Sequence, residues 1–503
     1  MEGSTEEYNL EADGVTILVQ ITRSKGGTHK YNLIIPTLEK PTLALLSAVR
    51  HELILKVPVA TKELLDPDSL SQVKEKFKKE ANLIISRKLP YISDKMKAFL
   101  IGQLLHEMVG LGTLEFLLND DLLEELVFNS AKEPVRVYHK KYGWLDTNVL
   151  VEDEAKINNY ASMIGRRVGR QITTLDPILD AHLVTGDRVN AVLYPISNKG
   201  NSITIRKFAR DPWTLTDFIK NNTTTDDVFA LIWIAIQYEM NILISGGTGS
   251  GKTSLLNVCM PFIPPNNRIV SIEDTRELQL PSFLHWCPMV TRLPNPEGKG
   301  GVTMLDLLVN SLRMRPDRIV LGEMRRREEG EVLFEAMHTG RSVYATVHAD
   351  TMAETIKRLV NPPIQIPPNL LGAVNLNVVM FRDRRKGIRR VSQMGEFIPS
   401  EDEQGLSVRP NILYRWKPSN DQMVPHSKSL RLFEELSRTT GMSQLEIDKD
   451  LRDRKQIFQY MVKNNIRSVE DVGKVMNQFY IDPEFVTQAA KQGKNPKIIL
   501  ENV

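Results

Sequence analysis

Residues 246–253 read Gly-Gly-Thr-Gly-Ser-Gly-Lys-Thr, a spacing of glycine, lysine and threonine that binds phosphate groups. The glycines allow the backbone to turn its N–H groups inward as a nest for an anion. Lys252 is placed to reach the β- and γ-phosphates of a nucleoside triphosphate, and the Thr253 hydroxyl to ligate Mg²⁺. The expected phosphate-binding residues are Gly246, Gly247, Thr248, Gly249, Ser250, Gly251, Lys252, Thr253 and Ser254.

The segments on both sides of this loop have the pattern that a phosphate-binding loop requires. Residues 241–245 are a short apolar run typical of a buried strand, and residues 252–259 predict a helix. The N-terminus of that helix would face the phosphates. The alternative is a Gly/Ser loop that only imitates the pattern, and the flanking strand and helix argue against it.

A second apolar run, downstream of the loop, ends in an acid. Residues 318–323 predict a strand with Glu323 at its end, where a carboxylate can orient a water or bind Mg²⁺. Most phosphate-loop enzymes carry an aspartate directly before this glutamate. Here that position is Gly322, so the site is short of one carboxylate.

Two other predicted strand ends offer polar side chains. The acidic segment 272–277 follows the apolar run 268–271 and could supply the missing carboxylate, while residues 343–348 end in His348. Taken singly, each could be a solvated strand end. In a parallel sheet, however, strand ends converge on one crevice, and the order of these segments after the loop favours that arrangement.

Composition and charge exclude several classes of protein. A net charge of +3 in a chain of 503 residues gives no general attraction to nucleic acid or membrane. Cys259 and Cys287 form no C-x-x-C pair, so neither a disulfide framework nor a zinc ribbon is indicated. The acidic first residues do not resemble a signal peptide, and the longest apolar run, 228–236, is far short of the ~20 residues that span a bilayer. We therefore expect a soluble, cytoplasmic protein.

The chain divides into regions by pattern. The runs 15–22 and 31–36 predict a hairpin, and apolar residues recur at helical spacing in 70–84 and 94–109. Asp211-Pro-Trp213 predicts a domain boundary. We expect an α/β fold class with an N-terminal α+β region (1–109), a small α/β domain (110–212), a parallel α/β domain with the phosphate loop (225–400) and a mainly helical C-terminal extension (401–503).

With these motifs in this order, the sequence resembles the ATPases of type II and type IV secretion systems, which power secretion, pili and the archaellum. The resemblance covers about residues 110–395 and implies a RecA-like ATPase domain that binds ATP and Mg²⁺. Its matching segments are the phosphate loop, the acidic "Asp box" 272–277, the atypical second nucleotide motif 311–325 and the "His box" 346–349.

The resemblance implies roles for particular residues. Glu323 and Glu277 are implied as catalytic acids, with Thr253 and Glu323 at the metal, and His348 as a sensor of the γ-phosphate. The segments 186–190 and 204–208 match those in which the N-terminal domain supplies arginines to the nucleotide. The implied catalytic set is therefore Glu323, Glu277, Lys252, His348, Arg188 and Arg206.

The sequence also departs from the family pattern. Arg326 stands where the family usually has a glycine, and the four-cysteine zinc element of many bacterial members is absent from the sequence. Residues 135–144 and 358–367 look like the archaeal branch. The resemblance then implies a cytoplasmic ring, most often a hexamer, that docks on a polytopic membrane platform protein.

Three alternatives stay open. An archaellum motor has the same chemistry with a different output, whereas a RecA-like nucleic-acid motor is disfavoured by the absence of a basic excess. A structural ring without hydrolysis is disfavoured because the expected acids are present. The basic run Arg382, Arg384, Arg385, Lys386, Arg389 and Arg390 is interpreted as a solvated hairpin at the sheet edge, with contact to nucleic acid or an acidic partner as the alternative.

Overall fold

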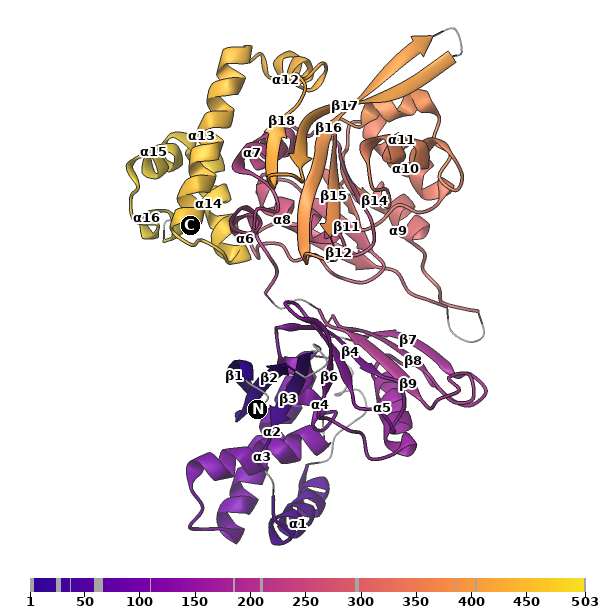
Figure 1. The fold of residues 1–503 in the computed structure, drawn as a ribbon, viewed down its shortest axis with the longest axis vertical. Coiled ribbons are helices and arrows are strands. Elements are labelled where there is room, and N and C mark those ends of the chain that lie inside the picture. The colour runs from indigo at the N-terminus through magenta and orange to yellow at the C-terminus, as the bar shows by residue number, and fades with distance from the viewer. Residues whose placement is uncertain are drawn as a thin grey trace. The chain divides into compact units, whose positions relative to one another are not determined.

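The computed structural model describes residues 4–23, 29–36, 38–57, 67–108, 110–183, 186–208, 211–294, 298–383, 385–402 and 405–501. The chain forms two compact units, Met1–Arg210 and Asp211–Val503, and each is described by itself (Figure 1). The division falls at the Asp211-Pro-Trp213 segment, where the sequence predicts a boundary. The first two regions expected from the sequence share the N-terminal unit, and the other two share the C-terminal unit.

The N-terminal unit is built on a mixed sheet in the order β1-β2-β3-β6-β5-β4-β9-β8-β7. Its strands are β1 (Ser4–Ala12), β2 (Val15–Arg23), β3 (His29–Ile34), β4 (Leu123–Phe128), β5 (Arg136–His139), β6 (Gly143–Thr147), β7 (Ile178–His182), β8 (Arg188–Val192) and β9 (Ser202–Arg206). β3 and β6 pair in parallel, and the other neighbours pair antiparallel.

Apolar spacing explains how this unit is held together. Alternate residues of β2 are buried, as a half-covered strand requires, and Val73, Phe77 and Ala81 form the buried face of α2. The predicted hairpin strands and both predicted helices are confirmed, while the turn residues 24–28 lie outside the described residues. The helices are α1 (Lys40–Lys56), α2 (Pro67–Lys88), α3 (Asp94–Met108), α4 (Leu114–Asn119) and α5 (Glu154–Arg167).

The C-terminal unit contains a second sheet, in the order β12-β11-β13-β14-β10-β15-β16-β17-β18. Its parallel strands are β10 (Ile242–Gly246), β11 (Ile269–Glu273), β12 (Trp286–Val290), β13 (Arg318–Leu321), β14 (Ser342–Val347) and β15 (Leu376–Asp383). The antiparallel strands are β16 (Ile388–Asp402), β17 (Gly405–Lys417) and β18 (Gln422–Pro425). The α/β fold class predicted from the sequence is confirmed. The apolar runs predicted as strands, 241–245, 268–271, 318–323 and 343–348, correspond to β10, β11, β13 and β14.

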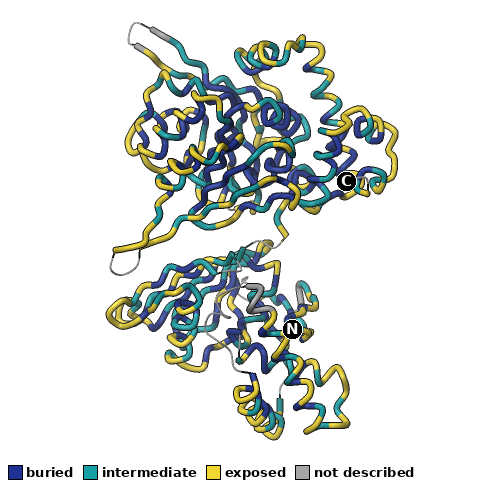
Figure 2. The backbone as a smooth tube through the Cα atoms, turned by 180° about the vertical axis from the view of Figure 1, so that it is seen from behind, coloured by how far each residue is buried: buried dark blue, intermediate teal, exposed yellow. Residues whose placement is uncertain are grey.

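Helices cover both faces of this parallel sheet, so its central strands are buried throughout (Figure 2). Ile242 and Ile244 of β10 pack into a core shared with α7 (Asp226–Gln237) and α8 (Lys252–Cys259). Leu243 packs on the opposite side, with α10 (Arg327–His338) and α11 (Met352–Val360). The remaining helices of this part are α6 (Leu215–Lys220), η2 (Met260–Phe262), α9 (Met304–Ser311) and η3 (Pro368–Ala373).

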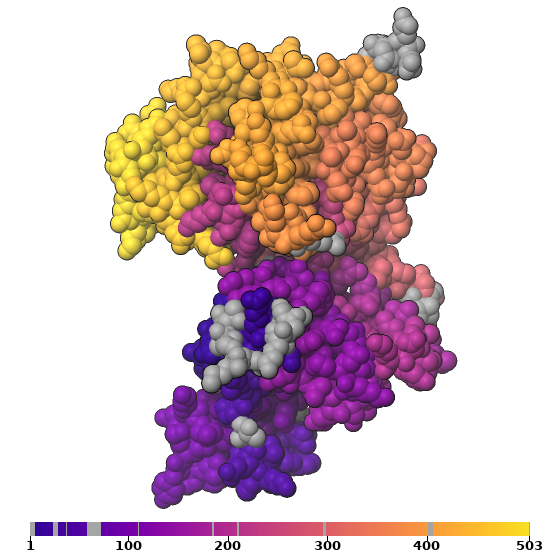
Figure 3. All heavy atoms as spheres, in the orientation of Figure 1, coloured from indigo at the N-terminus to yellow at the C-terminus, as the bar shows by residue number. Residues whose placement is uncertain are grey.

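The C-terminal helices belong to the same core as the phosphate-loop sheet. Phe458 of α13 contacts the rings of Phe229 and Trp233 on α7, and the guanidinium of Arg454 lies 4.3 Å from the Trp233 ring centroid. In the space-filling view their surface is continuous with that of β15–β18 (Figure 3). These helices are α12 (Leu432–Thr440), α13 (Gln444–Lys463), α14 (Val469–Ile481), α15 (Pro483–Gln492) and α16 (Lys497–Leu500). No helix in the described part of the chain is long and apolar enough to cross a membrane.

Two features of this unit differ from the sequence interpretation. The extension is helical only from Leu432 onward, because residues 405–425 form β17 and β18 and complete the sheet. The basic run does form a hairpin, between β15 and β16, but its predicted position at the sheet edge is wrong. β17 and β18 lie outside it, so the hairpin is an interior part of the sheet beside β10. Arg384 lies outside the described residues.

β11 ends in a buried carboxyl group. Glu273 is 2% exposed, and its Oε1 accepts hydrogen bonds from the backbone N–H groups of Glu277 (2.9 Å) and Leu278 (3.1 Å). These bonds hold the acidic segment in its turn after β11. Oε2 is buried and has no hydrogen-bond partner among the described residues. Burial raises the pKa of this carboxyl from its ordinary value of 4.5 to about 7.

The stability of the protein should therefore depend on the protonation of Glu273. Because its folded pKa is raised, the folded state binds the proton more tightly than the unfolded chain, and the unfolding free energy falls as pH rises from about 4.5 to about 7. The loss is on the order of 3 kcal/mol. We expect Glu273→Gln, which keeps the accepting oxygen, to flatten this dependence in urea unfolding measured between pH 5 and pH 8.

Glu335→Gln, at an exposed position of α10, is the matched control and should leave the pH dependence as in the parent protein. A Glu273→Gln protein that loses stability with pH as steeply as the parent would show that this carboxyl is already ionised in the folded state.

Candidate functional site

The phosphate loop leaves β10 at a point where only glycine fits. A β-carbon on Gly246 would lie 2.5 Å from the carbonyl oxygen of Met380, its partner across the β10–β15 pair. Gly249 has φ +69° and Gly251 has φ +98°, in the left-handed region that glycine adopts without strain. Ser250 Oγ donates to the carbonyl of Gly247 at 2.8 Å and closes the turn. The loop therefore has the backbone that its sequence predicts.

Lys252 is the first residue of α8 and folds back over the loop. Its Nζ donates to the carbonyls of Gly246 (2.9 Å) and Gly247 (3.1 Å). Burial lowers the pKa of its ammonium group, and the negative charges of Glu323 and Asp350 oppose that shift. Thr253 and Ser254 follow in the first turn of the helix, whose free N–H groups favour an anion.

Arg325 joins Glu323 to the acidic segment. Its Nε and Nη2 donate to Oε2 of Glu323 at 2.9 and 2.6 Å, and its Nη1 donates to Oδ2 of Asp274 at 2.7 Å. Glu323 comes from the end of β13 and Asp274 from the end of β11, which are neighbouring parallel strands. The structure thus brings the second acidic segment beside Glu323, through Asp274.

His348 and Glu277 complete the polar rim of this edge. His348 follows β14, and its Nε2 lies 3.1 Å from Oγ1 of Thr248 in the phosphate loop. Glu277 is exposed, and its charge, like that of Glu323, acts on Lys252. The ends of β10, β11, β13 and β14 therefore place these predicted residues around one position, as the strand order requires.

Three residues at the loop were not predicted as site residues. A β-carbon on Gly247 would lie 2.6 Å from Oδ1 of Asp350, which follows the His348 segment directly. On the other flank, Nε of Arg389 donates to the carbonyl of Gly249 at 3.1 Å, and Arg382 lies against the same glycine. Asp350 could have been found from its position just past a strand end. The arginines could not, because their sequence pattern does not reveal which strand neighbours β10.

Arg188 and Arg206 lie in the sheet of the N-terminal unit, directly opposite each other on β8 and β9. Arg188 pairs with Asp180 through two hydrogen bonds of 2.9 and 3.3 Å. The neighbouring Asp187 accepts a hydrogen bond from the backbone N–H of Phe208 at 2.7 Å. The two arginines share one place on the sheet, and their approach to a nucleotide stays a prediction.

The residues at the loop fit both ATP and Mg²⁺. Glycines at 246, 247 and 249, where an added β-carbon would lie 2.5–2.6 Å from neighbouring atoms, leave the backbone N–H groups of the loop open to a phosphate. No group of three or more His, Cys, Asp or Glu residues in the described ranges could hold a metal by itself. Mg²⁺ does not require one, since it is commonly held by one or two protein ligands together with phosphate oxygens and waters. The Thr253 hydroxyl and the Glu323 carboxylate are suitable ligands of that kind.

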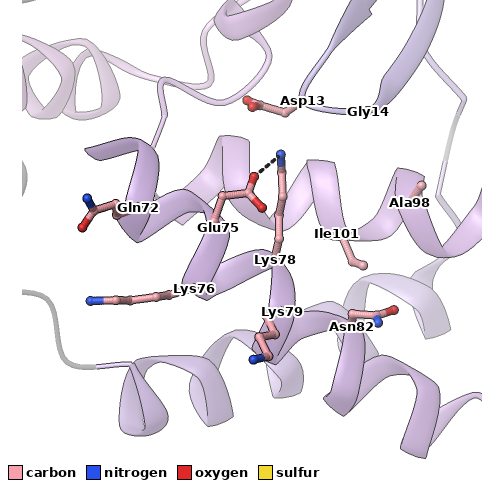
Figure 4. A pocket seen from close by; sticks show the side chains of 10 residues that line it. All are labelled: Asp13, Gly14, Gln72, Glu75, Lys76, Lys78, Lys79, Asn82, Ala98 and Ile101. Carbon is pink, nitrogen blue, oxygen red and sulfur yellow. Dashed lines mark hydrogen bonds and ion pairs between the residues drawn. The ribbon is translucent and has the colours of Figure 1, made fainter. Parts of the chain in front are cut away.

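A separate cavity of about 840 Å³ in the N-terminal unit does not carry this chemistry (Figure 4). Acidic and basic side chains both line it, including Asp13, Lys76 and Lys79. Within this lining, Lys78 forms an ion pair with Glu75 at 3.0 Å. None of the predicted site residues lines it.

Comparison with known proteins gives a consistent result. A family described as "Type II/IV secretion system protein" matches residues 146–382. An uncharacterized protein of Methanocaldococcus jannaschii is 36% identical over 382 residues, which cover 74% of this chain and 68% of that protein. The type IV secretion system protein PtlH of Bordetella pertussis is 31% identical over 288 residues, which cover 50% of this chain and 84% of PtlH.

Among solved structures, the VirB11 ATPase of the Brucella suis type IV secretion system in complex with sulphate is 25% identical. Its match has a TM-score of 0.29 and covers 56% of this chain and 90% of VirB11. The assignment of a family comes from the sequence relatives, because PtlH is more than 30% identical and the match spans most of its length. By the family match and by these relatives, the chain belongs to the type II/IV secretion system protein family.

Proposed function

We propose that the chain is a Mg²⁺-dependent ATPase that converts ATP and water to ADP and phosphate and couples this reaction to mechanical work. The observation that carries the proposal is the cluster at the sheet edge. There the ammonium group of Lys252, in the phosphate loop, interacts electrostatically with the carboxylates of Glu323, Asp350 and Glu277. Phosphoryl transfer to water needs a cation that binds the phosphate and carboxylates that orient the water and bind the metal. Membership of the secretion family supports the proposal.

Binding of ATP uses the loop and the start of α8. Lys252 exchanges its bonds to the Gly246 and Gly247 carbonyls for phosphate oxygens, and the loop N–H groups add donors of fixed direction. The hydroxyl of Thr253 and the carboxylate of Glu323 would hold Mg²⁺, which would supply positive charge to the phosphate oxygens. Binding therefore replaces contacts within the loop by contacts to the nucleotide.

Activation of the water falls to Glu323. In this structure its Oε2 accepts two N–H groups of Arg325, and a carboxylate so engaged polarises a water poorly. Before water can be activated, Arg325 must therefore break its hydrogen bonds to Glu323. Its guanidinium would then bind the phosphate oxygens or Asp274 alone. Glu277 compensates for the carboxylate that Gly322 lacks. We assign the sensing of the γ-phosphate to His348, and its contact with Thr248 in the phosphate loop supports this role.

Arg188 and Arg206 belong to the second half of the proposal. Both come from a unit without a phosphate loop of its own, and together they carry two positive charges at one place on its sheet. Arginines brought to the phosphates from such a unit neutralise charge in the transition state and link hydrolysis to domain motion. The pairing of Arg188 with Asp180 supplies the alternative, in which the arginine only holds the sheet together.

The biological setting follows from the family. We propose a homo-oligomeric ring, most simply a hexamer, that acts at the cytoplasmic face of a membrane through a polytopic platform protein. The relatedness to a Methanocaldococcus protein favours an archaeal secretion or pilus machine. An archaellum motor is the nearest alternative. A nucleic-acid motor is a more distant one, and stimulation of ATP turnover by DNA would favour it.

Glu323→Gln tests the role of the carboxylate. The amide keeps the shape of the side chain but cannot polarise water, so we expect near-normal ATP binding and turnover slower by about 10²–10⁴-fold. Phosphate release and equilibrium nucleotide binding measure the two effects. Glu328→Gln, at an exposed position in the first turn of α10, is the control. Turnover of Glu323→Gln at the rate of that control would remove Glu323 from the mechanism.

Arg188→Ala and Arg206→Ala test the contribution of the N-terminal unit. If the arginines cover charge on the transferring phosphoryl group, each variant should bind ATP and assemble, and should lose about 10³-fold or more in turnover. Arg136→Ala is a matched control, because Arg136 lies in the same sheet and pairs with Asp146 at 2.7 Å with similar exposure. Equal turnover in the three variants would leave these arginines with a structural role only.

A further inference from the structure

The hairpin between β15 and β16 brings two arginines to the phosphate loop. β15 pairs with β10 up to Gly246, so the end of this strand runs directly past the loop. Arg382 on β15 and Arg389 on β16 are opposite residues in the antiparallel pair. Opposite residues of such a pair point to the same face of the sheet. Both side chains therefore leave the hairpin on one side.

Contacts show that this side is the one that faces the loop. Arg389 Nε donates to the carbonyl of Gly249 at 3.1 Å, and its Cδ would lie 3.5 Å from a β-carbon on Gly251. A β-carbon on Gly249 would lie 2.6 Å from Nη1 of Arg382. The positive φ of Gly249 favours glycine at this position, and the end of the Arg382 side chain lies against it. The hairpin therefore places two positively charged side chains, Arg382 and Arg389, along this flank of the loop.

These two arginines lie on the flank of the loop opposite to Glu323 and Asp274. In the sheet, β15 and β16 stand on one side of β10, whereas β14, β13 and β11 stand on the other. The latter strands carry His348, Glu323 and Asp274. The γ-phosphate and the attacking water must lie toward those side chains. The part of the nucleotide on the arginine side is then the α-phosphate and the ribose that follows it.

We propose that Arg382 and Arg389 bind the α-phosphate end of the nucleotide, the portion that ATP and ADP share. The inference rests on the proposed ATPase function and adds a binding subsite to it. A guanidinium carries several N–H donors in a planar fork, so Arg389 can keep its bond to Gly249 and still offer donors to a phosphate oxygen. Two like charges directly opposite on a strand pair repel each other, and a bound anion relieves that repulsion.

Neighbouring basic residues have other tasks and supply controls. Arg390 is buried and binds Asp421 through two bonds of 2.7 Å, so it holds the hairpin to β17 and the turn that follows. Arg385 is exposed in the turn of the hairpin, where its backbone N–H donates to Asp383. Arg385 is therefore the matched control for a loss of positive charge from this hairpin.

The test compares affinity for ADP and ATP with turnover at saturating ATP. Arg382→Gln, Arg389→Gln and the double variant should each bind fluorescent ADP about tenfold or more weakly, as expected for the loss of a hydrogen bond to a charged group. The KM for ATP should rise in parallel, while kcat changes little. Arg385→Gln should match the parent protein in both. Arg382→Gln leaves the Arg389 bond to Gly249 in place, so it separates ligand binding from packing of the loop.

Three results would overturn the inference. Unchanged ADP affinity in the double variant would show that the arginines do not contact the nucleotide. A fall in kcat with unchanged ADP affinity would place them at the transferred phosphate instead. If the parent protein bound neither ADP nor ATP, the proposed ATPase function would fail together with this subsite, which distinguishes that failure from the other two.

Discussion

The site depends on one constraint, which is that neighbouring parallel strands end at the same edge of a sheet. β10, β14, β13 and β11 are adjacent, and their last residues lead into the phosphate loop, the His348 segment, Glu323 and the acidic segment. Burial on both faces fixes the register of these strands, since each alternates its side chains between two separate cores. Polar residues that are far apart in the sequence thus lie close together, because burial of the apolar residues before them fixes the register of each strand.

The charged groups of the site are paired with one another or with the backbone. Lys252 binds carbonyls of its own loop, Arg325 binds Glu323 and Asp274, and Glu273 stays within its turn. In the proposed ATPase, nucleotide binding would exchange these contacts for contacts to the phosphates. Such an exchange would couple the occupancy of the site to the positions of β13 and β11.

Local pattern predicted much of the C-terminal unit. The glycine spacing of 246–251, the apolar runs before it and before Glu323, and the helix at Lys252 all carry short-range signals, and the structure has each of them. What the sequence could not reveal depends on the order of strands in the sheet. The basic run has the local pattern of an edge hairpin, because no local signal shows that β17 and β18 continue the sheet beyond it. The proximity of Arg382 and Arg389 to the loop depends on this strand order. The pairing of Arg188 with Asp180 likewise cannot be predicted from local pattern, since it depends on the register of β7 and β8.

The central claim is that this phosphate loop hydrolyses ATP, and the most direct measurement is Mg²⁺-dependent phosphate release by the full chain and by its Lys252→Ala variant. Lys252 would compensate phosphate charge and belongs to neither apolar core, so we predict turnover in the parent and its loss in a Lys252→Ala protein that still folds. Lys357→Ala, at an exposed position of α11, should turn over like the parent. Native turnover in a folded Lys252→Ala protein would contradict the assignment of the site.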